Sequence, residues 1–77
     1  MKAKTCQLVL TTCPNRRAAN RIARTLVEER LAACVNILPV AQSVYRWRGK
    51  VASAREFLLI IKSLKRAYTK LEKRLRA

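Results

Sequence analysis

The segment from Leu26 to Pro39 constrains the fold more than any other part of the chain. It opens with apolar residues at helical spacing and passes through two alanines into the strand-like run Cys34–Leu38, with almost no linker. Helical periodicity that changes to strand periodicity in this way is how a βαβ unit returns to its sheet. Pro39 interrupts the run, and because proline cannot donate to a ladder, it predicts a bulge or an edge there.

The residues before this passage predict a strand and a helix. Cys6–Thr12 is a short apolar strand that Pro14 ends, and Asn15 is a natural N-cap for the helix that follows. The apolar residues of this helix recur at i, i+3 and i+4 spacing and define one buried face: Ala18, Ala19, Ile22, Ala23, Leu26, Val27 and Leu31.

The second half of the chain predicts a hairpin and a second helix. Val40–Trp47 continues the strand, Arg48–Lys50 forms the turn, and the chain returns from Val51. Phe57–Lys62 is apolar at successive positions, as in a central strand covered on both faces. A last helix is expected from about Leu64 to Ala77. The order βαββα predicts an α+β fold of the ferredoxin-like, split βαβ type.

Three motifs in this order make the chain similar to a known family. They are Leu26–Pro39 (LVEERLAACVNILP), Thr12–Asn15 (TCPN) and Ser43–Lys50 (SVYRWRGK). The chain resembles the CutA divalent-cation tolerance family. The resemblance implies a PII-like trimer architecture, weak binding of copper or other divalent metals, and a role in cation tolerance.

The resemblance also implies that residues 1–77 form one domain that is incomplete at its C-terminus. Members of the family continue with a strand that opens with a His-Pro-Tyr motif, a further strand and a closing helix. In a ferredoxin-like sheet the next strand pairs with the first, so we expect Cys6–Thr12 to keep an open apolar edge, which recruits partners. The chain is then half of a split domain, a truncated product or an assembly-dependent fragment. The fourth alternative is that the open edge is tolerated.

The composition argues against an enzyme. The chain has no histidine and no aspartate, and its carboxylates are four glutamates. Acid–base chemistry near neutral pH usually draws on histidine or paired carboxylates, and a single glycine excludes a glycine-rich phosphate loop. Three cysteines without a disulfide spacing, no signal peptide and no membrane-spanning stretch predict a cytoplasmic protein with reduced thiols.

Cys13 and Cys34 are the candidate metal ligands, since they stand where the family's motifs place cysteines. Thiolates suit copper and zinc ions, although no cofactor is required. In a βαβ crossover Cys13 ends one strand and Cys34 begins a parallel one, so they are expected at opposite ends of the sheet. A shared site would then need different subunits. The alternative is that each cysteine is a small buried apolar residue.

Tyr45 and Trp47 are candidates for an intersubunit contact. They alternate along a strand and therefore point to one face. The resemblance implies that this stretch helps to build the surface between the subunits of a trimer, and large aromatic residues are typical interface anchors. The alternative is ordinary core packing for both.

The charge of the chain suggests a different function. Eighteen basic residues against four acidic ones give a net charge of +14. The basic residues of the last helix, among them Arg66, Lys70, Lys73 and Arg74, could bind a polyanion, an anionic membrane surface or an acidic partner chain. No nucleic-acid recognition motif is present, so such binding would be nonspecific. The alternative is a solvated cationic face, of natural or engineered origin.

Overall fold

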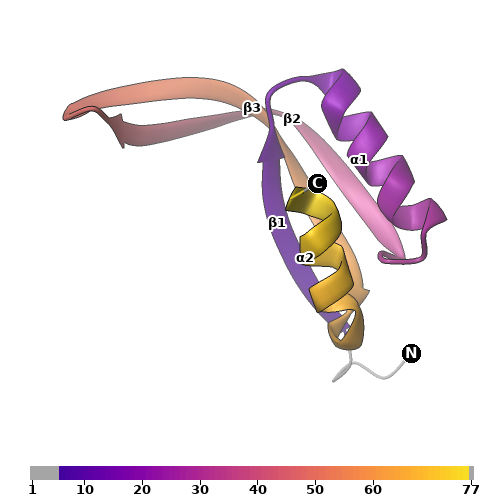
Figure 1. Ribbon diagram of the computed structural model, residues 1–77. Coiled ribbons are helices and arrows are strands. Elements are labelled where there is room, and N and C mark those ends of the chain that lie inside the picture. Colours follow the sequence, from indigo (N-terminus) through magenta and orange to yellow (C-terminus); the bar gives the residue numbers. More distant parts are fainter. Residues whose placement is uncertain (1–5, 77) are drawn as a thin grey trace.

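The computed structural model describes residues 6–76, apart from the side chains of residues 40 and 41. The elements, shown in Figure 1, follow the predicted order. They are β1 (Cys6–Cys13), α1 (Arg16–Glu28), β2 (Cys34–Trp47), β3 (Lys50–Leu64), the 3₁₀ turn η2 (Lys65–Ala67) and α2 (Tyr68–Arg76).

The sheet has the order β1-β3-β2, and β3 is antiparallel to both neighbours. Ile61 of β3 lies opposite Val9 of β1 on one side and opposite Val35 of β2 on the other. β1 and β2 are therefore parallel to each other, with α1 connecting them and β3 between them. This confirms the split βαβ arrangement of a ferredoxin-like fold.

Local interactions set both ends of α1. The side chain of Asn15 accepts a hydrogen bond from the backbone N–H of Ala18 at 2.8 Å, which confirms the predicted N-cap. At the other end the backbone N–H of Leu31 donates to the carbonyl of Leu26 at 2.9 Å, around Arg30 at a φ of 60°. This Schellman-type ending stops α1 at Glu28, so the prediction that Leu31 lies within the helix is wrong.

The core lies between the sheet and the two helices, which cover the same face of the sheet (Figure 1). Leu26 of α1, Leu71 of α2, and Leu59 and Ile61 of β3 are fully buried. Their alternate neighbours Leu58 and Ile60 point to the other face and are only half-buried. β3 is therefore central as predicted, but within the described chain it is covered on one face only.

The outer part of the β2–β3 hairpin extends away from the helices as an arm (Figure 1). The pairing shifts between Leu38 and Ala41, so that two residues of β2, Pro39 and the one after it, oppose Phe57 alone. This confirms the bulge predicted at the proline. At the tip, Arg48 and Gly49 both have positive φ angles, of 51° and 78°, as a two-residue hairpin turn requires.

In the second half of the chain, the extent of β3 and the start of the helical segment after it differ from the prediction. β3 is one strand of 15 residues, because it pairs with β2 along the arm and then with both neighbours in the body. Leu64 is its last residue and pairs with Cys6, so the prediction that a helix begins at Leu64 is wrong. The described residues contain no helix long and apolar enough to cross a membrane.

Candidate functional site

The two candidate metal ligands lie far apart. Cys13 is at the end of β1 opposite Phe57, and Cys34 is at the start of β2 opposite Lys62, five positions further along β3. Cys13 is 2% exposed beneath the helices, whereas Cys34 is exposed on the other face of the sheet. The structure therefore separates Cys13 and Cys34 as the topology predicts and does not bring them together.

The surroundings of both thiols disfavour a metal site within one chain. Burial raises the pKa of the Cys13 thiol above its usual value, and the Glu56 carboxylate raises it further, against a smaller opposite effect of Arg21. Cys34 has the ammonium-bearing Lys62 as its direct cross-strand neighbour, which repels cations. Among residues 6–76 no three cysteine or carboxylate side chains gather as ligands. Within residues 6–76, one copy therefore supplies no set of three such ligands.

Tyr45 and Trp47 lie on the arm and are exposed, at 44% and 60%. They pair with Ala52 and Lys50, which alternate along β3 on the same side as Leu58 and Ile60. Core packing within the chain is therefore excluded for both aromatic residues. The guanidinium of Arg48 lies 5.6 Å from the Trp47 ring centre, a cation–π distance.

These aromatic residues belong to a larger apolar surface, which we name the helix-free face. It is the side of the sheet that the described helices leave uncovered, and its large apolar residues are Leu8, Leu10, Leu38, Tyr45, Trp47, Leu58 and Ile60. Leu8 and Leu10 of β1 are 65% and 64% exposed. The sequence predicted an open apolar edge at β1 but missed this face, because strand alternation does not reveal which side the helices cover.

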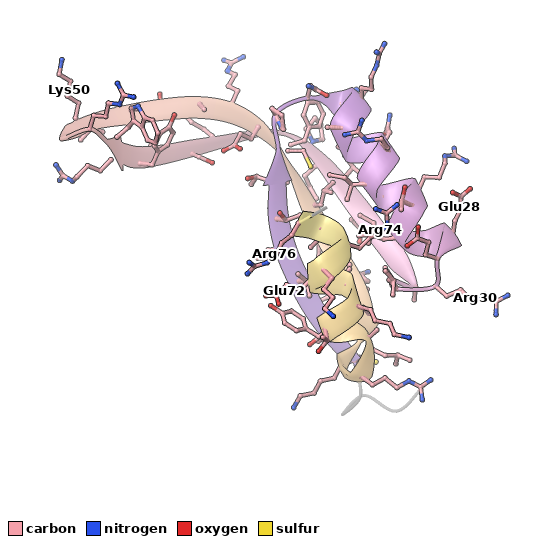
Figure 2. All side chains as sticks on the ribbon, viewed as in Figure 1. Glu28, Arg30, Lys50, Glu72, Arg74 and Arg76 are labelled. Carbon is pink, nitrogen blue, oxygen red and sulfur yellow. The ribbon has the colours of Figure 1, made fainter. Side chains whose placement is uncertain are left out.

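The basic residues of the second helix divide into two groups. Arg66 lies in η2 and is exposed, while Lys70, Lys73 and Arg74 line a hollow beside α1. Figure 2 shows Arg74 between the helices, where its Nε donates to both carboxylate oxygens of Glu29, at 3.0 and 3.1 Å. Arg74 is therefore positioned by an ion pair between α1 and α2, which the sequence did not suggest.

Comparison with known proteins covers nearly the whole chain. Residues 7–77 match the family described as CutA1 divalent ion tolerance protein. The chain belongs to the CutA1 family. It is 49% identical over 71 residues to the divalent-cation tolerance protein CutA of Thermus thermophilus, spanning 92% of this chain and 69% of that protein. It is 55% identical over 56 residues to the chloroplastic CutA protein of Arabidopsis thaliana, spanning 73% and 31%.

Solved CutA structures share the fold. The structure from Synechococcus elongatus superposes with a TM-score of 0.92 at 34% identity, covering 99% of this chain and 67% of that one. The Xylella fastidiosa structure gives a TM-score of 0.90 at 44% identity, with coverages of 92% and 68%. The ferredoxin-like, PII-like fold of the CutA1 family is thus confirmed for this chain. The chain spans about two thirds of these structures and less than one third of the Arabidopsis protein.

Proposed function

We propose that this CutA1 chain acts in divalent-cation tolerance as an assembling protein without catalytic activity, which binds copper or another divalent cation weakly. Its family and the names of its relatives, which are tolerance proteins, support this role. The structural observation that carries it is the helix-free face, because a sheet with apolar residues as exposed as Leu8 and Leu10 needs a partner.

A homotrimer is the partner arrangement that we favour. The family resemblance supports it, and Tyr45 and Trp47 are exposed aromatic residues on the helix-free face, as interface anchors should be. A complementary chain that adds a strand beside β1 is the competing arrangement. Both arrangements would cover Leu8 and Leu10, but only the homotrimer requires no second, different polypeptide.

Trp47 provides a direct test of the arm's role, since it is the only tryptophan. In the isolated chain Trp47 is 60% exposed, so its fluorescence should be that of a solvated indole. As the concentration of the chain rises, we expect the emission to shift to shorter wavelength in parallel with the mass of the particle. A rise in mass without any shift would exclude Trp47 from the interface.

The metal contacts that we propose are the thiols of Cys34 and Cys13, each acting with groups from another copy. Cys34 is the stronger candidate because it is exposed, while the buried Cys13 thiol keeps its proton. We expect copper(I) and zinc ions to bind the native chain weakly and in a pH-dependent manner, since thiols lose protons on binding. A Cys13→Ser/Cys34→Ser variant should lose this binding, and a Cys6→Ser variant should retain it. Equal binding by both variants would refute the assignment.

We also propose a cytoplasmic location, which three cysteines without a disulfide spacing favour. The names of relatives vary here, since the Archaeoglobus fulgidus structure is titled periplasmic and the Arabidopsis protein chloroplastic. Fractionation of cells that express the chain tests the proposal, and recovery outside the cytoplasmic fraction would contradict it.

A further inference from the structure

A furrow runs between α1 and α2 on the side of the molecule opposite to the helix-free face. A hollow of about 290 Å³ lies between the middle and second half of α1 and the end of α2, with Arg21 and Arg74 on its two walls. A second hollow of about 410 Å³ shares Arg74 with it, and a third shares Leu31 with the second. The first two hollows therefore adjoin at Arg74 along the seam between the helices, and the third adjoins the second at Leu31, beside the residues that follow α1.

The walls of the furrow are strongly cationic. Five basic side chains line it: Arg21, Arg30, Lys70, Lys73 and Arg74. The lining contains one carboxylate, Glu29, and both of its oxygens accept from the Nε of Arg74. The second ion pair between described residues, Arg76 with Glu72, lies on the side of α2 away from α1 (Figure 2). Four cations of the furrow thus have no carboxylate partner within residues 6–76.

Apart from Val27, which is 43% exposed in the third hollow, the floor of the furrow exposes little apolar surface to a ligand. Leu26 is 1% exposed, and Ile22, Leu31 and Leu75 are half-buried against the core. The large apolar residues that are mostly exposed lie instead on the sheet. An amphipathic acidic peptide would therefore bury little apolar area here, and the attraction must come from charge. Arginine and lysine together suit phosphate groups, which accept forked guanidinium contacts as well as single ammonium contacts.

We infer that this furrow binds a linear phosphate polymer through its phosphates, without reading bases. The nine residues of α2 extend for about 13.5 Å. This length exceeds the distance between neighbouring phosphates of a single strand, so the furrow can contact more than one phosphate at a time. The inference concerns the helical face and is independent of cation tolerance, which we assign to the opposite face and the thiols.

The test compares two variants that lose the same charge in different places. Arg21→Gln/Lys70→Gln/Lys73→Gln removes three furrow cations and leaves the Arg74–Glu29 pair intact. Arg46→Gln/Lys50→Gln/Arg55→Gln removes three exposed cations from the arm, whose tip Figure 2 marks at Lys50. All six side chains are exposed, so both variants should fold, which circular dichroism checks.

Binding of a labelled oligothymidylate is then measured by fluorescence anisotropy across a salt series. We expect the furrow variant to bind at least about tenfold more weakly, and its slope of log affinity against log salt to fall by about 2, at about 0.7 per lost contact. The arm variant should keep the native slope. A single Lys73→Gln variant, with about a third of the slope change, serves if the triple variant does not fold.

Competitors identify the chemistry that is recognised. Inorganic polyphosphate should displace the oligothymidylate, and poly-glutamate of similar charge should do so poorly. The inference is overturned if both triple variants lose affinity equally, because the attraction is then only diffuse charge. Failure of polyphosphate to compete would also overturn it, because it would indicate recognition of the bases. Equal competition by poly-glutamate would overturn it too, as would the absence of detectable binding at low salt.

Discussion

Arg30 occupies a backbone position that favours glycine. It follows α1 at a φ of 60°, and its own backbone N–H donates to the carbonyl of Val27, while that of Leu31 donates to Leu26. A non-glycine residue in this left-handed conformation costs the folded state about 1–2 kcal/mol. Glycine would remove this cost, but part of the gain would be lost because glycine gives the unfolded chain more conformational entropy. Most of the stability of this ending must therefore come from the hydrogen bonds and from Leu31 packing on the core.

Arg30→Gly should stabilise the chain by up to about 1 kcal/mol in urea denaturation. Arg24→Gly is a suitable contrast, because Arg24 lies within α1, where glycine costs about 1 kcal/mol. If Arg30→Gly destabilised the chain as much as Arg24→Gly, the left-handed ending of α1 would be wrong.

The thiols of Cys13 and Cys34 should differ strongly in reactivity. Cys34 is exposed, and Cys13 is 2% exposed with its pKa raised by burial and by Glu56. At mildly alkaline pH, mass spectrometry should show iodoacetamide modifying Cys34 well before Cys13. Equal rates in the folded chain would contradict the buried placement of Cys13.

The raised pKa of Cys13 also sets the sign of a pH effect on stability. The folded state holds the thiol proton more tightly than the unfolded state does, so the stabilisation is fully present below the usual value of 9.0. It is lost as the pH rises from that value through the raised one. Cys13→Ala should flatten this alkaline loss of stability.

At the scale of elements, α2 depends on one residue. It has nine residues, too few for an isolated helix to be stable, and Leu71 is its fully buried side chain. Leu71→Ala should cost about 2–5 kcal/mol and release α2 from the sheet. Hydrogen exchange should then show loss of protection in Tyr68–Arg76 before α1, whereas Leu75→Ala, at a half-buried site, should do less. Uniform loss of protection in both helices would contradict this account.

The sequence predicted the order of the elements because each carries a clear hydrophobic period. The ends depend on pairing and on single backbone angles, so Leu31 and Leu64 were placed in the wrong elements. The separation of Cys13 from Cys34 followed from topology alone. The furrow could not be predicted, since it requires Arg21 of α1 to face Arg74 of α2, and neither helix's pattern specifies its neighbour.

At the scale of the whole molecule, the two sides have opposite character. Apolar side chains such as Leu8, Leu10 and Trp47 are exposed on the helix-free face, while the furrow and its cations lie on the helical side. With a net charge of +14, copies of the chain repel one another unless their cations stay apart. Association through the helix-free face turns the cations of the furrow outward and leaves Lys50 and Lys62 as the lysines of β3 that the contact must accommodate.

The central claim is that other copies cover the helix-free face, and sedimentation velocity across a range of concentrations tests it most directly. We expect a particle of about three chains that dissociates on dilution. A Leu8→Lys/Leu10→Lys variant should shift the equilibrium strongly towards the single chain, because it buries charge in the contact. A native chain that sediments as a folded monomer at every concentration would contradict the claim.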